Sequence, residues 1–245
     1  MRGVIQFQPM RHGTLLLVIL QHTYYKLAVE DEHSGPRTTD IFTPAGDLIA
    51  TVRPGFAFDL SLEGSGKLSD GRIVNYSAVC SHGTPGYHGV TSCYRVLDAQ
   101  QYPWGRGHGV PVEPLRSVAV DSSVIPYGTT VYIHEFDGLQ IPLISGAGGF
   151  THDGLFRAED SGGGIRGNHI DIYAGPTAMY RWLEARIPTS YPHGTGLHAE
   201  LLPASAAPPR FASRGAGGFL LYASMAAGAY VLYEVWKSRR RAIAR

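Results

Sequence analysis

The sequence lacks several features that would assign a function by composition alone. Its 245 residues carry 21 Lys and Arg against 20 Asp and Glu, so no basic field is present to hold a nucleic-acid backbone. No internal repeat recurs at a solenoid period. The glycine run at 162–167 lacks the lysine and the spacing of a phosphate-binding P-loop. Nucleic acid is therefore excluded as an expected partner, and a repeat architecture is not expected.

Glycine, proline and apolar residues are all plentiful. The chain is 44% hydrophobic and 17% charged, which suits one well-packed domain with room for a smaller module. Its 31 glycines and 16 prolines fall between short runs of Val, Ile, Tyr and Thr. This pattern is typical of many short strands joined by turns, so we expect a mainly β fold.

The order of these runs predicts most elements. We expect a first buried strand over Thr14–Tyr25 and β-type runs over 40–60, among them FAFDL at 56–60. A segment that begins with Pro176 is predicted to be a helix, because proline is favoured at a first helical position. The Pro- and Ala-rich stretch 191–214 is predicted to be a linker. Four strands are expected in close order in SVAV, TTVYIHEF, GLFRAE and NHIDIYA.

The segment Gly215–Trp236 is the longest apolar stretch, with Glu234 as its one charge. At about 1.5 Å per residue it would extend roughly 33 Å, enough for a bilayer core. The tail 237–245 is basic, so the positive-inside rule places it in the cytoplasm and the folded domain outside. We therefore expect a transmembrane helix as the membrane contact; an amphipathic helix packed on the domain is the alternative.

Only two cysteines are present, Cys80 and Cys93, and they close a Gly-rich loop. In an exported domain such a pair is expected to form a disulfide, which contributes about 3 kcal/mol in the chain-entropy model. Adding His82 and His88 would give four zinc ligands, but their spacing is not a common zinc pattern. We expect the disulfide and no metal; two free buried cysteines are the third alternative.

The strand NHIDIYA contains an acid that its pattern does not explain. Alternation places Ile170, Ile172 and Ala174 on one face and Asp171 on the other. Aspartate is a poor strand former, so Asp171 marks either a solvated face or a site.

Two longer segments favour a functional site at Asp171 over a solvated face. RSVAVDSSVIPYGTTVYI at 116–133 and AEDSGGGIRGNHIDIYAG at 158–175 resemble the three-aspartate (3D) domain, and especially the membrane-bound lytic transglycosylase A family. Further similarity lies in TYYKLAVEDEHSGP at 23–36 and EGSGKLSDGRIVNY at 63–76, so the resemblance covers most of residues 20–178.

The fold implied by this resemblance is a double-psi β-barrel with a smaller inserted β module. One short helix would follow the barrel, and the transmembrane helix would come last. Residues 1–190 would form this domain, with a barrel core at 111–178, early barrel strands at about 14–60 and an inserted segment at about 61–110.

The resemblance also implies an activity. Family members cleave the β-1,4 bond between N-acetylmuramic acid (MurNAc) and N-acetylglucosamine (GlcNAc) in peptidoglycan, and leave 1,6-anhydro-MurNAc ends. Asp171 matches the single catalytic acid/base of the family, and Asp160 and Asp121 match its other two acids. A raised pKa is required, from burial or from a nearby like charge. The positions implied in substrate binding are Tyr24, Glu63, Gly163, Gly164 and Arg166.

Two other functions remain open on the same residues. Three acids are compatible with a glycoside hydrolase, because ordinary glycosidases use a second carboxylate. A glycan-binding barrel without turnover is the other alternative, because one fold hosts many roles. The expected partners are peptidoglycan glycan strands and, through the C-terminal helix, the bacterial inner membrane. The domain is expected to face the periplasm or the cell exterior, and no cofactor is expected.

Overall fold

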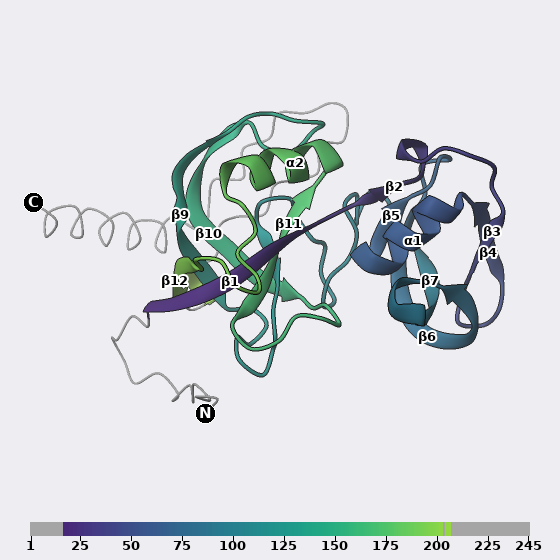
Figure 1. Ribbon diagram of the computed structural model, residues 1–245, viewed down its shortest axis with the longest axis horizontal. Coiled ribbons are helices and arrows are strands. Elements are labelled where there is room, and N and C mark those ends of the chain that lie inside the picture. The colour runs from purple at the N-terminus through teal and green to yellow at the C-terminus, as the bar shows by residue number, and fades with distance from the viewer. Residues whose placement is uncertain (1–16, 203, 207–245) are drawn as a thin grey trace, which may run out of the picture.

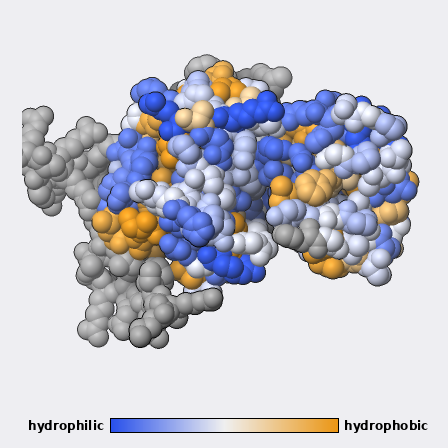
Figure 2. Space-filling model, in the orientation of Figure 1, coloured by the Kyte–Doolittle hydropathy of each residue, from blue (hydrophilic) through white to orange (hydrophobic). Residues whose placement is uncertain are grey.

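The computed structural model describes residues 17–202 and 204–206 as a barrel and a smaller module. In Figure 1 these two bodies lie side by side, and strand β1 (Leu17–Lys26) runs across the barrel toward the module. Figure 2 shows a mostly polar face with small apolar patches on both bodies. The chain builds the module between β1 and β8 (Ser117–Ala119), so the insertion falls between two barrel strands.

The barrel is closed, with the strand order β1-β11-β8-β10-β9-β12. Neighbouring strands run antiparallel except in two pairs, β1 with β11 and β8 with β10, which are parallel. Closure removes free sheet edges, so every strand finds two partners. The predicted mainly β class and the barrel are confirmed. The remaining barrel strands are β9 (Thr130–Ile141), β10 (Phe150–Asp160), β11 (His169–Gly175) and β12 (Leu197–Leu202).

Alternation along β11 separates the barrel core from an outer face. Ile170, Ile172 and Ala174 are fully buried in the core, as their spacing predicts. Burying each of the two isoleucine side chains contributes about 1.5–3 kcal/mol. Tyr173 points the other way and packs in a second cluster with Tyr25, on the outer face. Asp171 has the same parity as Tyr173, so it too belongs to this outer face.

The module spans residues 28–97 and has its own core. A four-stranded sheet, β2-β5-β6-β7, lies beside the hairpin β3–β4. The early β runs therefore do not enter the barrel, apart from β1, and the inserted body begins well before the expected residue 61. The strands are β2 (Ala28–Val29), β3 (Thr39–Phe42), β4 (Leu48–Val52), β5 (Ser65–Lys67), β6 (Ile73–Pro85) and β7 (Thr91–Leu97), with short 3-10 turns at Glu30–Glu32 and Tyr87–Gly89.

The run FAFDL, expected as β, lies in helix α1 (Pro54–Glu63). Phe56, Ala57 and Leu60 are its buried residues, a spacing that matches one face of a helix. Proline occupies the first turn, and Gly64 ends the helix in the left-handed conformation with a φ of 78°. These two end signals outweigh the aromatic composition, so the β prediction for this run is wrong.

Helix α2 (Thr177–Arg186) begins just after Pro176, close to its expected start. It does not follow the barrel, because strand β12 comes after it and pairs with both β1 and β9. Residues 197–202 belong to the segment expected to be a linker, yet Leu197, Ala199 and Leu201 alternate into the barrel core. The last described turn is a 3-10 turn at Ala204–Ala206.

The predicted fold class included a membrane-crossing helix, and that part is corrected. Among the described residues, neither α1 nor α2 has the length and apolar character to cross a bilayer, and each contains only 10 residues. The stretch 215–236 that carried the prediction lies outside the described residues. The fold of the described part is thus a mainly β barrel and module with two α-helices.

Candidate active site

The outer face of the parallel pair β1 and β11 carries the candidate site. In the ladder Thr23 lies opposite Asp171, and Tyr25 lies opposite Tyr173. Directly paired residues of neighbouring strands point to the same face, so these four side chains form one surface. The rings of Tyr25 and Tyr173 contact each other with centroids 4.6 Å apart. Asp171 therefore lies beside a buried aromatic pair and is only partly open to solvent.

Asp171 is held through one of its two oxygens. The hydroxyl of Thr23 donates a hydrogen bond to Asp171 Oδ1 over 2.7 Å. Burial raises the pKa of Asp171 from 3.8 to about 7, with smaller contributions from the negative charges of Glu63 and Asp160, while the Thr23 bond opposes the rise. A carboxyl with a pKa near neutrality can both donate and accept a proton under physiological conditions.

Asp160 ends strand β10 and lies two strands away from Asp171. Both aspartates pair with the same residue, Ala119 of β8, which lies between them in the barrel. The Tyr25 hydroxyl donates to Asp160 Oδ2 over 2.7 Å, and the backbone N–H of Ser161 donates to Oδ1 over 2.8 Å. Burial raises the pKa of Asp160 to about 6, against the lowering effect of these two hydrogen bonds. Both aspartates therefore have a pKa above the ordinary value of 3.8.

Asp121 has a different environment from the other two acids. Its Oδ1 accepts from the hydroxyl and the backbone N–H of Ser123, over 2.6 and 3.1 Å, and its Oδ2 accepts from the backbone N–H of Gly167 over 2.9 Å. The Ser123 hydroxyl, followed by these backbone N–H groups, lowers the pKa of Asp121. Asp121 thus stays ionised and ties the glycine-rich loop to the turn after β8.

Glu63 brings a fourth carboxyl to the site from the module. It is the last residue of α1, and its Oε2 accepts from the backbone N–H of Lys26 over 2.9 Å. The Lys26 ammonium lies 3.6 Å from the other oxygen. Burial raises the pKa of Glu63 to about 7, and its charge acts on Asp171 more strongly than that of Asp160 does. The sequence resemblance singled out Glu63 for substrate binding; in the structure its charge also raises the pKa of Asp171.

Tyr24, which the resemblance placed in substrate binding, lies on the opposite side of β1. Its ring is buried in the barrel core and its hydroxyl donates to the carbonyl of Ile187 over 2.8 Å. Thr23 and Tyr25, its two neighbours, contact Asp171 and Asp160 instead. The reason is the two-residue period of a strand, which turns Tyr24 away from the face that its neighbours share.

The glycine-rich loop between β10 and β11 is open to solvent. Gly163 and Gly164 are exposed, and a methyl group at either position would meet no atom within 4 Å. The guanidinium of Arg166 bends back onto its own loop and donates to the carbonyls of Ile165 and Gly162, over 2.7 and 3.4 Å. Arg166 therefore contacts none of the three aspartates through a hydrogen bond in the described structure.

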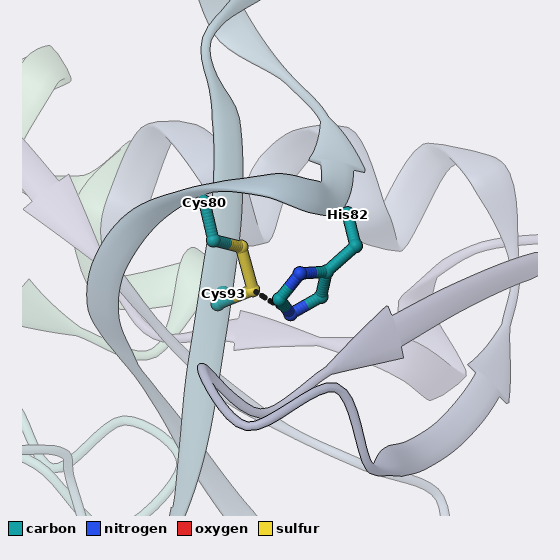
Figure 3. A group of neighbouring side chains, drawn as sticks. All are labelled: Cys80, His82 and Cys93. Carbon is teal, nitrogen blue, oxygen red and sulfur yellow. Dashed lines mark hydrogen bonds between the residues drawn. A yellow bond between two sulfur atoms is a disulfide. The ribbon is translucent and has the colours of Figure 1, made fainter.

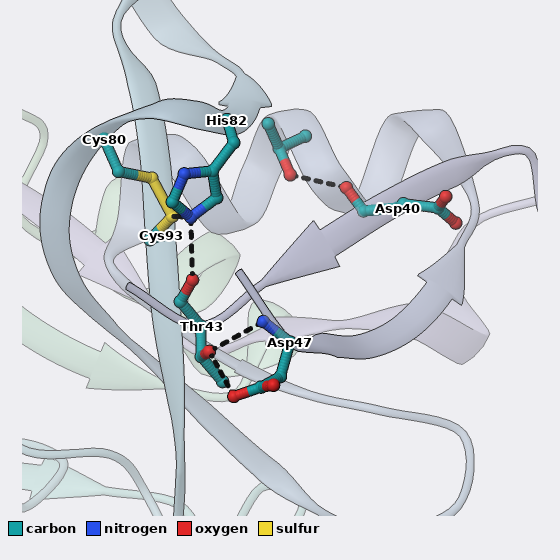
Figure 4. The surroundings of a disulfide bond; sticks show 7 residues. Asp40, Thr43, Asp47, Cys80, His82 and Cys93 are labelled. Carbon is teal, nitrogen blue, oxygen red and sulfur yellow. Dashed lines mark hydrogen bonds between the residues drawn. A yellow bond between two sulfur atoms is a disulfide. The ribbon is translucent and has the colours of Figure 1, made fainter. Parts of the chain in front are cut away.

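The two cysteines lie far from this site, in the module. Cys80 and Cys93 are joined by a disulfide with their Cα atoms 6.0 Å apart, and the Nε2 of His82 lies 3.6 Å from Cys93 Sγ (Figure 3). His82 Nε2 also lies 3.1 Å from the carbonyl oxygen of Thr43 in the β3–β4 turn (Figure 4). These three side chains gather closely enough to suggest metal ligation. With the sulfurs bonded to each other, no thiolate remains for an ion.

Sequence reasoning missed the residues of β1 and β11 that complete the site. Thr23 and Tyr25 bind the two aspartates, and Tyr173 donates from its hydroxyl to the carbonyl of Trp104 over 2.7 Å. The sequence contained a signal for Thr23 and Tyr25, because both flank Tyr24 and so lie on the other face of the predicted strand. That signal predicts a contact with Asp171 only when the pairing of β1 with β11 is known.

Comparison with known proteins matches part of the barrel to a known domain family. Residues 116–181 match the 3D domain family. The chain contains a 3D domain. Asp121, Asp160 and Asp171 all lie within the 3D domain, and the resemblance expected from the sequence motifs is confirmed.

Two curated relatives share part of the chain. Membrane-bound lytic murein transglycosylase A of Vibrio cholerae serotype O1 is 33% identical over 70 residues, which are 27% of this chain and 17% of the relative. The protein of the same name in Escherichia coli K12 is 40% identical over 77 residues, or 29% of this chain and 20% of the relative. The chain thus matches about a fifth of the length of these relatives.

Solved structures similar to this one carry related names. The structure of E. coli MltA with bound chitohexaose is 18% identical, has a TM-score of 0.49, and covers 75% of this chain and 71% of its own. A membrane-bound lytic murein transglycosylase from Agrobacterium tumefaciens is 14% identical with a TM-score of 0.46, and covers 78% of this chain and 74% of its own.

Proposed function

We propose that the protein is a peptidoglycan lytic transglycosylase with Asp171 as its only acid/base. The observation that carries this proposal is the environment of Asp171. Its carboxyl is partly buried, one oxygen is occupied by Thr23, and its pKa of about 7 allows both protonation states near neutral pH. The relatives that share the 3D domain are named lytic murein transglycosylases, which supports the same reaction.

The reaction needs one carboxyl to act twice. Protonated Asp171 gives its proton to the oxygen of the β-1,4 bond between MurNAc and GlcNAc, and the bond from MurNAc C1 to that oxygen breaks. The GlcNAc fragment leaves with a free 4-hydroxyl. The resulting carboxylate then takes the proton from the MurNAc 6-hydroxyl as its oxygen bonds to C1. The product is a 1,6-anhydro ring, Asp171 is protonated again, and no water is consumed.

The other acids then have supporting roles. Burial raises the pKa of Asp160 to about 6. Its charge, together with that of Glu63, favours the protonated form of Asp171. Asp121 holds the backbone of Gly167 and so places the exposed glycine loop, where we propose that Gly163, Gly164 and Arg166 meet the glycan.

We infer an extracytoplasmic location, the periplasm or the cell exterior. Peptidoglycan lies there, and the disulfide of the module suits an oxidising compartment. The relatives that match the 3D domain are called membrane-bound.

Mass analysis of the products from purified peptidoglycan tests the reaction. We expect muropeptides with 1,6-anhydro ends, which are one water lighter than hydrolysis products. Asp171→Asn should lower the turnover rate by about 10²- to 10⁴-fold, because general acid/base assistance is lost. Glycan binding should persist. An exposed aspartate in a turn provides the control, Asp98→Asn, which should retain full activity.

Other outcomes identify the alternatives. Products that carry a reducing MurNAc end would show a hydrolase. Binding to peptidoglycan with no product from any cell wall would show a glycan-binding barrel. Near-normal anhydro product from a folded Asp171→Asn protein would remove Asp171 from its assigned role.

A further inference from the structure

A chain of hydrogen bonds extends from Asp171 through Thr23 to His169. Thr23 Oγ1, which donates to Asp171 Oδ1 over 2.7 Å, lies 2.9 Å from the Nε2 of His169. His169 begins β11 two residues before Asp171, so both side chains are on the outer face. Parallel pairing of β1 with β11 puts Thr23 directly opposite Asp171, and this is why one hydroxyl reaches both partners.

The chemistry of the three groups fixes the direction of this chain. A threonine hydroxyl carries a single proton, and a carboxylate can only accept. Because Thr23 gives its proton to Asp171, its contact with His169 requires a proton on the histidine Nε2. The same arrangement holds when Asp171 is protonated, since the Thr23 proton still needs an acceptor. Oδ1 then remains the acceptor, and the acidic proton lies on Oδ2.

We propose that His169, acting through Thr23, is a positioning residue that keeps the transferable proton of Asp171 on Oδ2. This inference rests on the proposed function, in which that proton is given to the glycan. It adds a task for a residue that contacts neither the substrate nor the reacting oxygen. Without the histidine N–H, the Thr23 hydroxyl rotates freely, and either oxygen of Asp171 can carry the proton.

The histidine ring is itself held in place. His169 is 5% exposed, and its ring stacks on Tyr191 with centroids 3.9 Å apart and planes within 8° of parallel. The loop with Tyr191 is fastened to β1, because the backbone N–H groups of Ser190 and Tyr191 both donate to the carbonyl of His22. The orientation of the Nε2–H bond toward Thr23 is therefore set by packing before any substrate arrives.

The charged surroundings favour a neutral histidine beside an acid of high pKa. Burial lowers the pKa of His169, a hydrogen bond with the backbone of Gly164 opposes this, and the nearby His22 lowers the pKa further. The negative charges of Glu63 of α1 and Asp160 of β10 raise the pKa of Asp171, after the larger effect of burial. Thr23 is the group that opposes them.

Two substitutions separate the hydrogen bond from the packing. His169→Phe keeps a flat ring against Tyr191 but removes the N–H, whereas His169→Gln restores an N–H donor at similar reach. The readout is the titration of the Asp171 carboxyl carbon, followed by NMR in the full chain with ¹³C-labelled aspartate. This measurement needs no substrate, so it remains decisive even if the proposed activity is absent.

We expect His169→Phe to raise the pKa of Asp171, because a weaker bond from Thr23 stabilises the carboxylate less. Loss of one hydrogen bond corresponds to about a tenfold decrease in turnover, with little change in KM. The basic limb of the pH profile should move to higher pH. His169→Gln should restore both values. An unchanged Asp171 titration in folded His169→Phe, or equal defects in the two variants, would overturn the inference.

The wild-type protein supplies a test that needs no substitution. A ¹⁵N–¹H correlation spectrum of the histidine rings should show His169 protonated at Nε2 near pH 7. A neutral ring protonated at Nδ1 would leave Thr23 without its donor and would contradict the proposal.

Discussion

Replacing Asp171 by asparagine should stabilise the fold at pH 8 and leave it almost unchanged at pH 4. In the unfolded chain this carboxyl ionises near its ordinary pKa of 3.8, whereas burial raises the pKa in the folded state to about 7. Below pH 3.8 both states bind the proton and stability is intact. As the pH rises from 3.8 to 7, only the folded state keeps the proton, so the free energy of unfolding falls.

The structure sets the size of this effect. Each pH unit between the two pKa values corresponds to about 1.4 kcal/mol, so the ionised carboxylate costs the fold about 4 kcal/mol above pH 7. Asparagine carries no charge, and its side-chain oxygen can still accept the hydrogen bond from Thr23. In a chain of this size 4 kcal/mol raises Tm by on the order of 10 °C.

Urea unfolding of the full chain at intervals from pH 4 to pH 8 measures the difference. The free energy gained by Asp171→Asn should grow steadily across this range, and the matched variant Asp98→Asn, at an exposed turn, should show no such trend. The reasoning is refuted if the gain is the same at every pH, or if Asp171→Asn is the less stable protein at pH 8.

Two further changes test the surroundings of the site and the module. Glu63→Gln should lower the pKa of Asp171, because it removes a negative charge that raises it; an unchanged titration of the Asp171 carboxyl carbon by NMR would contradict this. Replacing Cys80 and Cys93 by serine should cost about 3 kcal/mol in urea unfolding, since the disulfide closes a short loop of the unfolded chain. Equal stability with and without the disulfide would show that the module does not depend on it.

Local patterns in the sequence predicted part of the barrel. Alternation in NHIDIYA is enough to place Ile170 and Ile172 in the core and Asp171 on the other face, and the structure agrees. Proline and glycine signals are equally local: Pro176 precedes the start of α2, and Pro54 and Gly64 mark the two ends of α1. Such features depend on neighbours within a few residues, so they are readable from one chain.

The pairing of strands that are far apart in the sequence could not be predicted from the sequence. The hydrogen bond between Thr23 and Asp171 joins residues 148 positions apart, and it forms only because β1 lies parallel to β11 in one register. A shift of that register by a single residue would present Tyr24 instead of Thr23. The sequence thus named the acid but not the hydroxyl that holds it.

The sequence by itself determined that Asp171 lies within a strand, on the face opposite Ile170 and Ile172, and that a glycine-rich loop separates it from Asp160. Only the tertiary structure decided how the acids differ. It buried Asp171 and Asp160, left Asp121 bonded to Ser123 and Gly167, and brought Glu63 in from the module. The physical reason is that a pKa depends on desolvation and on charges in space, and both arise only when distant segments pack together.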